Sequence, residues 1–199
     1  MVETNDRRLP VGIQSFEKIR KEGYLYVDKT DIIWQLANRN KTYHYLSRPR
    51  RFGKSVLVDT LEAYFLGKKE LFEGLKIMQM ETEWVKRPVI RLDMSRAGAE
   101  PETLRSYLDI TFDRLEEEYG ITPKPTARLA DRFDAIIQTA YEQTGQQVAI
   151  LIDEYDSPLQ HSWKTPQHEA CTAIYREVFA ILKADDKYEK FVFITGITK

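Results

Sequence analysis

A glycine, a lysine and a serine stand together as Gly53, Lys54 and Ser55, in the order that ends a phosphate-binding loop. The common form of that loop is G-x-x-x-x-G-K-[ST]. Its backbone N–H groups surround the phosphates, its lysine contacts the terminal phosphates and its hydroxyl helps to hold Mg²⁺. Arg48 replaces the first glycine of that form. The sequence therefore contains a loop that could bind a nucleotide but begins differently from the common form.

The residues at the start of the loop change its chemistry. Arg48 precedes a proline, which restricts its backbone to extended conformations, and Pro49 has no N–H to donate. Arg50 and Arg51 could compensate, because guanidinium groups bind phosphate oxygens through paired hydrogen bonds. The loop would then bind phosphate partly through side chains instead of amides.

Two interpretations of Arg50 and Arg51 remain open. They bind phosphate, or they face solvent or pair with Glu154 or Asp156 and so hold an empty loop shut. On the first interpretation we expect the nucleotide-binding residues to be Arg50, Arg51, Phe52, Gly53, Lys54, Ser55 and Val56.

The loop lies between a segment typical of a strand and one typical of a helix. Residues 42–47 are rich in aromatic side chains and alternate, which predicts a strand, and we expect it to be the first central strand. Gly67 is placed to end the helix that follows the loop. Apolar residues recur there at helical spacing, as Leu57, Leu61, Tyr64 and Phe65. The order strand, loop, helix is the context that a phosphate-binding loop needs.

A pair of carboxylates follows the most apolar run in the chain. Residues 148–152 are all aliphatic, as in a parallel strand buried on both faces, and Asp153 and Glu154 come directly after them. Ligands bind beyond the carboxyl ends of such strands, so we expect Asp153 to hold Mg²⁺ opposite Ser55, directly or through water. We expect Glu154 to orient and deprotonate an attacking water. A capping role for this pair is the alternative.

Strand and helix patterns alternate along the rest of the chain. Strand candidates cover residues 88–94 and 191–196, and helical patterns cover residues 100–120, 129–145 and 165–182. This alternation predicts an α/β three-layer sandwich around a mainly parallel sheet, with right-handed crossovers.

Two more polar residues lie at the ends of strand candidates. Thr195 lies near the end of the last one, where its hydroxyl could sense the γ-phosphate. We therefore place Thr195 with Glu154 and Lys54 among the catalytic residues. Asp93 lies near the end of the strand candidate at residues 88–94, and it is either a turn residue or a member of the site.

Length and composition limit the class of protein. With 199 residues, 42% hydrophobic and 31% charged, the chain has the size and balance of one soluble globular domain. The net charge of −1 provides no general attraction to nucleic acid or to anionic membranes. The one cysteine, Cys171, excludes an internal disulfide and fits a reducing compartment. No segment is typical of a signal peptide or a membrane span, so we expect a cytoplasmic protein.

We interpret residues 1–199 as a single domain, with a lead-in at residues 1–41 and a nucleotide-binding core at residues 42–199. The lead-in is predicted to contain a turn of helix, a short strand and a second helix, at residues 16–19, 24–27 and 30–38.

Four motifs carry a resemblance to a known family. They are LPVGIQSF at residues 9–16, YVDKT at residues 26–30, RPRRFGKS at residues 48–55 and LIDEYD at residues 151–156. In this order they resemble the AAA-ATPase-like family of bacterial P-loop proteins, over essentially the whole chain. RPRRFGKS is the normal loop of that family, so the resemblance implies that Arg48 is part of a working loop.

The resemblance also implies a fold and a set of roles. The fold is the additional-strand, catalytic-glutamate class of P-loop NTPases, with sheet order 5-1-4-3-2. The implied Walker A residues are Lys54 and Ser55, which would contact the nucleotide and the metal. The implied Walker B residues are Asp153 and Glu154, which would bind the metal and the water, and Thr195 is the implied sensor.

Members of the family usually continue into a fifth strand, a helical lid and often a C-terminal nuclease-like domain of the PD-(D/E)xK type. On this resemblance we expect the chain to be truncated at its C-terminus, without the last strand and the lid. An exposed sheet edge could then pair with a second copy.

These features favour a Mg²⁺-dependent module that binds and hydrolyses ATP as a switch or motor for an attached effector. The adjacent Asp153 and Glu154 favour water over a substrate hydroxyl as the nucleophile. Two alternatives remain: a scaffold gated by ATP with little hydrolysis, and a regulatory module associated with nucleic acid. The low net charge and the lack of interleaved aromatic residues in the loop argue against direct nucleic-acid binding.

Overall fold

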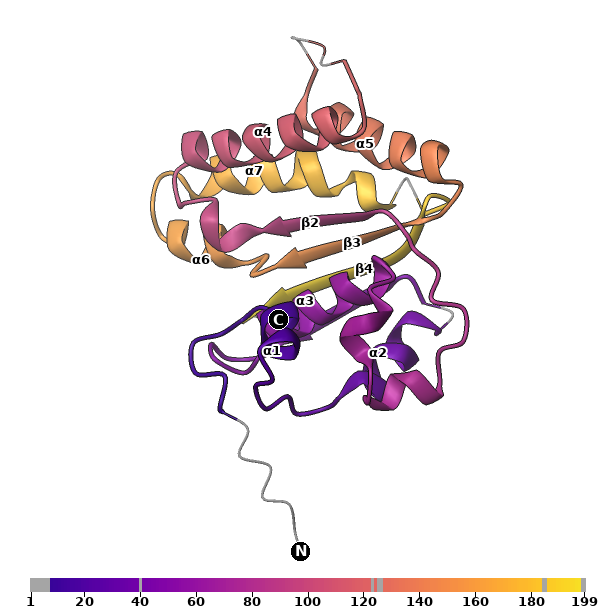
Figure 1. The fold of residues 1–199 in the computed structure, drawn as a ribbon. Helices are drawn as coiled ribbons and strands as arrows, with labels where there is room; N and C mark the ends of the chain where they lie inside the picture. Colours follow the sequence, from indigo (N-terminus) through magenta and orange to yellow (C-terminus); the bar gives the residue numbers. More distant parts are fainter. Residues whose placement is uncertain (1–7, 40, 123, 125–126, 184–185, 198–199) are drawn as a thin grey trace, which may run out of the picture.

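The computed structural model describes residues 8–39, 41–122, 124, 127–183 and 186–197. Its centre is a four-stranded sheet in which all strands are parallel and the order is β1-β4-β3-β2 (Figure 1). The strands are β1 (Tyr43–Ser47), β2 (Val89–Asp93), β3 (Val148–Asp153) and β4 (Glu189–Gly196). The predicted α/β class with a parallel sheet is confirmed.

Helices cover both faces of this sheet, so that three layers are visible in Figure 1. One face carries α1 (Phe16–Lys21), α2 (Thr30–Ala37) and α3 (Lys54–Phe65). The other face carries α4 (Pro101–Glu118), α5 (Leu129–Thr144) and α7 (His168–Phe179). Shorter elements are α6 (Ser157–Ser162) and the 3₁₀ turns η1 (Lys69–Phe72), η2 (Lys76–Gln79), η3 (Met94–Arg96) and η4 (Ile181–Lys183).

Strand β3 holds the two halves of the core together. All six of its residues are buried. Because successive side chains of a strand point to opposite faces, Ile150 and Ile152 pack under α4, α5 and α7, whereas Ala149 and Leu151 pack against the layer of α3. The aliphatic run thus behaves as the pattern of a strand buried on both faces predicts.

Strand β1 differs from its prediction as a central strand, because it forms an edge of the sheet. Its only sheet partner among the described residues is β4. Tyr43 and Tyr45 remain 45% and 49% exposed. Aromatic alternation marks a half-buried strand as readily as an interior one, and this explains the error.

The lead-in is helical where its pattern predicted helices. Asp28 accepts hydrogen bonds from the backbone N–H and the hydroxyl of Thr30, at 2.9 and 2.7 Å, and so stabilises the start of α2. The strand predicted at residues 24–27 is wrong, since this segment has no regular structure. It is tied instead to the start of the described chain by a bond from Leu25 N to Arg8 O, 2.9 Å long.

Two details of the last third of the chain were not predicted. α6 follows the end of β3 directly, and α7 begins at His168, later than the threonine and proline at 165 and 166 indicate. Within the part of the chain that the structure describes, no helix has the length and apolar character needed to cross a membrane.

Candidate nucleotide-binding site

The loop between β1 and α3 contains a buried lysine at the start of a helix. Lys54 is the first residue of α3, and it is 4% exposed. Its Nζ donates hydrogen bonds to Arg48 O at 3.1 Å and to Pro49 O at 3.3 Å. Gly53 just before it has φ +75, a left-handed conformation that glycine adopts without strain. The loop therefore closes on the ammonium group of its own lysine.

This arrangement suits an anion. The N–H groups in the first turn of a helix have no partner within the helix, and the helix dipole adds partial positive charge there. Lys54, Ser55 and Val56 form that turn, and Ser55 and Val56 are half-buried. A charged oxygen is a stronger acceptor for an ammonium than the neutral carbonyls that now bind Lys54.

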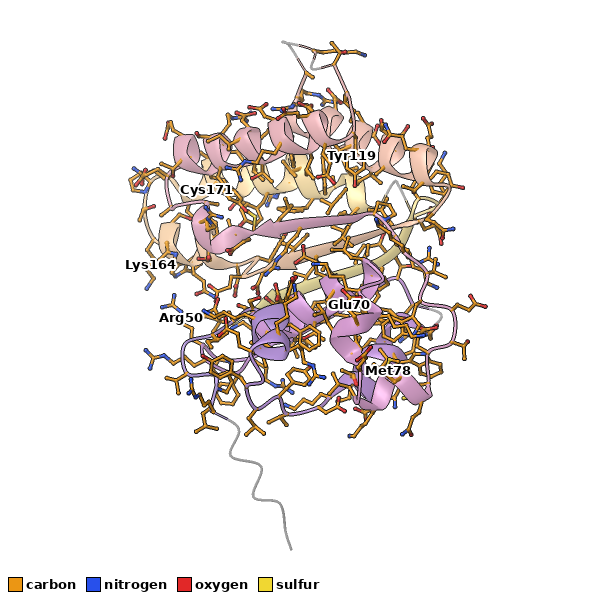
Figure 2. All side chains as sticks on the ribbon, viewed as in Figure 1. Arg50, Glu70, Met78, Tyr119, Lys164 and Cys171 are labelled. Atoms are coloured by element: carbon orange, nitrogen blue, oxygen red, sulfur yellow. The ribbon has the colours of Figure 1, made fainter. Side chains whose placement is uncertain are left out.

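The loop arginines point away from the protein. Arg50, Arg51 and Phe52 are exposed, and Figure 2 shows Arg50 at the molecular surface. Among the described residues, neither Arg50 nor Arg51 forms an ion pair or a hydrogen bond, so the proposed pairing with Glu154 or Asp156 is absent from this part of the structure. Arg51 has φ +67, which turns the loop before Gly53.

The carboxylate at the end of β3 is bonded to the end of β4. Thr195, fully buried, donates its hydroxyl proton to Asp153 Oδ1. The backbone N–H of Glu154 donates both to Thr195 Oγ1 at 3.0 Å and to Asp153 Oδ1 at 3.1 Å. These three predicted residues therefore form one hydrogen-bonded group.

Glu154 has an unusual backbone. Its φ of +49 lies in the left-handed region, which side chains other than glycine rarely adopt. The side chain is half-buried. The bonds made by its N–H hold this conformation in place, and such strain is common at functional sites.

Strand register brings the loop and the carboxylates to the same end of the sheet. Ser47 pairs with Gly196, and Arg48 N donates to Gly196 O at 3.1 Å, so the loop begins beside the end of β4. On the other side of β4, Ile152 pairs with Ile194. The predicted site residues therefore all lie at the carboxyl ends of the strands, on the same side of the sheet.

Asp93 is part of a local turn. Its Oδ1 accepts hydrogen bonds from the backbone N–H of Ser95 at 3.2 Å and from the Ser95 hydroxyl at 2.6 Å, and so caps η3. It pairs in register with Asp153 on the neighbouring strand. The turn alternative from the sequence is thus confirmed for Asp93.

Asp156 was left without a role by the sequence, and the structure shows one. Its buried carboxylate accepts from Ile197 N at 2.8 Å and from Gln160 Nε2 at 2.5 Å, joining the segment after β3 to the end of β4. Gly196 permits this approach, because an added Cβ would lie 3.0 Å from Asp156 Cγ and 2.7 Å from Tyr45 Oη. A glycine as the last residue of a buried strand was the available signal for this contact.

A cavity of about 730 Å³ borders the loop on the side of the lead-in. One wall comes from the lead-in and includes Pro10 and Ile13, and the other from the loop and α3 and includes Phe52 and Val56. Most of its lining side chains are apolar. It was not predicted from the sequence that the lead-in forms a wall of a cavity beside the loop. The apolar residues that begin it, of which Leu9 is 66% exposed, were the available signal.

Comparison with known proteins identifies a relative and a family of this chain. A protein of Azotobacter chroococcum mcd 1, described as "Uncharacterized protein in vnfD 5'region", is 34% identical over 198 residues, which cover 97% of this chain and 38% of the relative. The chain thus spans well under half of that relative's length. No solved structure gives a significant match. A family model described as "Predicted AAA-ATPase" matches residues 10–199, and the chain therefore belongs to the AAA-ATPase-like family.

Proposed function

We propose that this chain binds ATP at the loop before α3 and hydrolyses it with the help of Mg²⁺. The observation that carries the proposal is the buried ammonium of Lys54, held at a helix start by two neutral carbonyls. A phosphate would replace those carbonyls with charged acceptors. The family, whose name indicates an ATPase, supports the same ligand.

The phosphates would lie over the first turn of α3. The N–H groups of that turn and Lys54 would bind the β- and γ-phosphates. Arg50 and Arg51, which form no ion pair among the described residues, would add guanidinium contacts on the outer side of the loop. Pairing with Glu154 or Asp156 is absent among the described residues, and we propose phosphate binding in place of a role that only faces solvent.

Ser55 and Asp153 would hold the metal ion. Both hydrogen bonds that Asp153 accepts from described residues fall on Oδ1, which leaves Oδ2 as a possible ligand or as an acceptor from metal-bound water. No group of three or more metal-binding side chains occurs among the described residues. Magnesium in nucleotide sites commonly takes only one or two protein ligands together with phosphate oxygens and water. When bound, the ion would neutralise charge that develops on the phosphates.

Glu154 would act as the base for the attacking water. Its N–H bonds fix the backbone next to Asp153, and a half-buried carboxylate at this position can orient a water molecule and accept its proton. Thr195 would keep Asp153 in place by donating its one hydroxyl proton to it, and would respond to the γ-phosphate indirectly, through Asp153 and Glu154. Water is then the nucleophile, and the products are ADP and phosphate.

The nucleoside would lie in the cavity between the lead-in and the loop. Gly53 and Arg48 line this cavity, so it opens directly beside the proposed phosphate position. Its apolar walls fit the faces of a purine ring. The lead-in would thus form part of the nucleotide site.

We also propose a specific class of P-loop fold and a biological role for ATP turnover. The strand order β1-β4-β3-β2 supports the additional-strand, catalytic-glutamate class, because it equals the last four positions of the order 5-1-4-3-2. We propose that ATP turnover drives an effector attached to this module or supplied by a partner. The 38% coverage of the curated relative is consistent with such further domains.

Turnover and binding measured on two variants test this proposal. Glu154→Gln should bind ATP in the presence of Mg²⁺ as the wild type does and release no phosphate. Glu169→Gln, a change in the exposed first turn of α7, is the matched control and should hydrolyse ATP normally. If wild type binds ATP without releasing phosphate, the chain is an ATP-gated scaffold. Full activity of Glu154→Gln would remove Glu154 from the role of base.

A further inference from the structure

We propose that Asp59 is a positioning residue that fixes the lead-in over the nucleotide loop and thereby makes the site selective for the nucleoside part of ATP. This inference rests on the proposed function, since it concerns the same site. It assigns no contact with ATP to Asp59 itself. It concerns how the two walls of the cavity beside the loop are held together.

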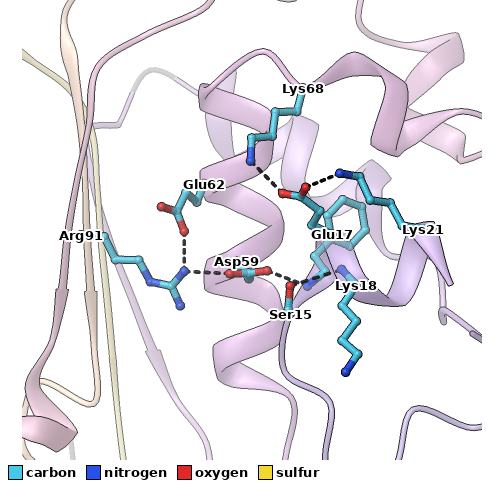
Figure 3. A network of polar contacts seen from close by, with 9 residues as sticks. Ser15, Glu17, Lys18, Lys21, Asp59, Glu62, Lys68 and Arg91 are labelled. Atoms are coloured by element: carbon cyan, nitrogen blue, oxygen red, sulfur yellow. Dashed lines mark hydrogen bonds and ion pairs between the residues drawn. The ribbon is translucent and has the colours of Figure 1, made fainter.

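Asp59 joins three parts of the chain through one carboxylate. It lies in α3, four residues and about one helical turn after Ser55. Its Oδ2 accepts a hydrogen bond from the backbone N–H of Phe16 at 2.6 Å, and its Oδ1 accepts one from Arg91 Nη1 at 2.8 Å (Figure 3). The helix that follows the phosphate loop is therefore bonded directly to the start of α1.

The bond to Phe16 has a clear physical basis. Phe16 is the first residue of α1, where backbone N–H groups lack partners within the helix and a negative charge is favourable. The Phe16 side chain is fully buried, and its ring centroid lies 5.0 Å from those of Tyr26 and Phe72. Asp59 thus anchors a helix start whose side chain is already fixed by packing.

The same anchor sets the position of one wall of the cavity. Ile13 and Pro10 line the cavity and lie three and six residues before Phe16. Val56, on the opposite wall, lies three residues before Asp59 in α3. Two short segments therefore lead from the Asp59–Phe16 bond to the two walls. Loss of the bond would loosen the lead-in wall next to the loop, although Arg20 and the packing of Phe16 still hold α1, and it would leave the first turn of α3 in place.

Glu62 provides an internal control for this role. It lies on the same helix and forms an ion pair with the same atom, Arg91 Nη1. None of its hydrogen bonds among the described residues goes to α1. Other contacts join α1 to the segment after α3. Arg20 donates to Leu71 O at 2.8 Å and to Glu73 O at 2.6 Å, and Lys68 Nζ forms an ion pair with Glu17 Oε2 at 2.9 Å between side chains that are each 39% exposed, where ion pairs contribute little. Asp59 and Glu62 therefore share the Arg91 contact and differ in the contact with α1.

Phosphates and nucleoside should respond differently to this change. The triphosphate is expected to contact the loop and the first turn of α3, which keep their geometry when Asp59 is replaced. The nucleoside requires the lead-in wall as well. Asp59→Ala should therefore weaken binding of ATP and leave binding of inorganic tripolyphosphate unchanged.

The test is calorimetric titration of ATP and of tripolyphosphate, each with Mg²⁺, into wild type, Asp59→Ala and Glu62→Ala. We expect Asp59→Ala to lose about tenfold in ATP affinity, the effect of one hydrogen bond to a charged group, with tripolyphosphate affinity unchanged. Glu62→Ala should bind both ligands as the wild type does. Equal losses for both ligands in Asp59→Ala, no loss at all, or the same selective loss in Glu62→Ala would each overturn the inference.

A second measurement needs no variant and serves if Asp59→Ala does not fold. Amide hydrogen exchange of residues 9–16 in wild type should be slowed by ATP and unaffected by tripolyphosphate. Equal protection by both ligands would contradict a role of the lead-in in nucleoside binding. If wild type binds neither ligand, the proposed function fails and this inference fails with it. If wild type binds both and only the Asp59 comparison fails, the proposed function stands.

Discussion

Thr195 donates its hydroxyl proton to the carboxylate of Asp153, and this bond joins the ends of β4 and β3 at the centre of the candidate site. The same hydroxyl accepts the backbone N–H of Glu154 at 3.0 Å. A single buried hydroxyl thus orients the proposed metal ligand and the residue proposed as base. A shift of Thr195 would therefore displace both Asp153 and Glu154.

Replacing Thr195 by valine should therefore affect both stability and turnover. The change keeps the shape of the side chain, and it removes one of the two acceptors of the Glu154 N–H and one of the two donors to Asp153 Oδ1. We expect a loss of about 1–3 kcal/mol in the free energy of unfolding, measured in urea, together with slower ATP hydrolysis. Thr195→Ser, which keeps the hydroxyl, should retain most of the stability and most of the rate of ATP hydrolysis.

Thr172→Val is the matched control for that experiment. The hydroxyl of Thr172 donates to His168 O within α7, remote in sequence from the site, at 2.8 Å. Loss of the Thr172 hydroxyl should change the free energy of unfolding little and should leave the rate of ATP hydrolysis unchanged. A Thr195→Val protein with the stability and activity of wild type would show that the buried hydroxyl has no such function.

Glu154→Gly should make the protein more stable and inactive. Left-handed backbone costs roughly 1 kcal/mol for a residue with a Cβ, and glycine avoids that cost. The observed φ of +49 therefore predicts a higher melting temperature for the glycine variant in calorimetric scans. Glu154→Gln keeps the same strain and should melt as the wild type does. A lower melting temperature for Glu154→Gly would show that the strain is absent.

The lead-in should be sensitive to acid through Asp28. Burial opposes ionisation of this carboxyl, but hydrogen bonds from the hydroxyl and the N–H of Thr30 and from Lys76 N outweigh it, so its pKa lies below the usual 3.8. A lowered pKa contributes stability that is fully present above pH 3.8 and is lost as the pH falls through the folded-state value.

Asp28→Asn should accordingly be less stable than wild type at neutral pH, and the difference should shrink once the pH falls below about 4. Urea unfolding at several pH values from 7 to 3 measures this directly. Asp31→Asn, a change in the first turn of the same helix, controls for the loss of a negative charge there. A difference between wild type and Asp28→Asn that is independent of pH would contradict the role of the ionised carboxylate.

Much of the fold could be predicted because its signals are local. The aliphatic run of β3, the glycines that end α3 and α5, and the strand before the loop each reflect burial or backbone geometry of a few residues. The local pattern did not predict the edge position of β1, which follows only from the family order 5-1-4-3-2 without its fifth strand. Strand order depends on contacts between distant segments, and aromatic alternation fits an edge or an interior position equally well.

In the candidate site, too, the residues marked by local patterns could be predicted, and the contacts that depend on the tertiary structure could not. Lys54, Asp153, Glu154 and Thr195 could be proposed from the sequence because each lies at or next to the end of a strand or the start of a helix. Three contacts were not predicted: the bond from Lys54 to the loop carbonyls, the contact of Asp156 at Gly196 and the bond from Phe16 N to Asp59. Each depends on the three-dimensional approach of polar groups whose residue types are common on any surface.

Titration of ATP into wild type and Lys54→Ala, with and without Mg²⁺, tests the central claim most directly. Lys69→Ala, an exposed lysine after α3, is the control. We predict that Lys54→Ala binds ATP roughly a hundredfold more weakly than wild type, because charge-assisted hydrogen bonds to phosphate are lost, and that Lys69→Ala binds normally. Equal affinity of Lys54→Ala and wild type for ATP would show that the nucleotide does not bind at this loop.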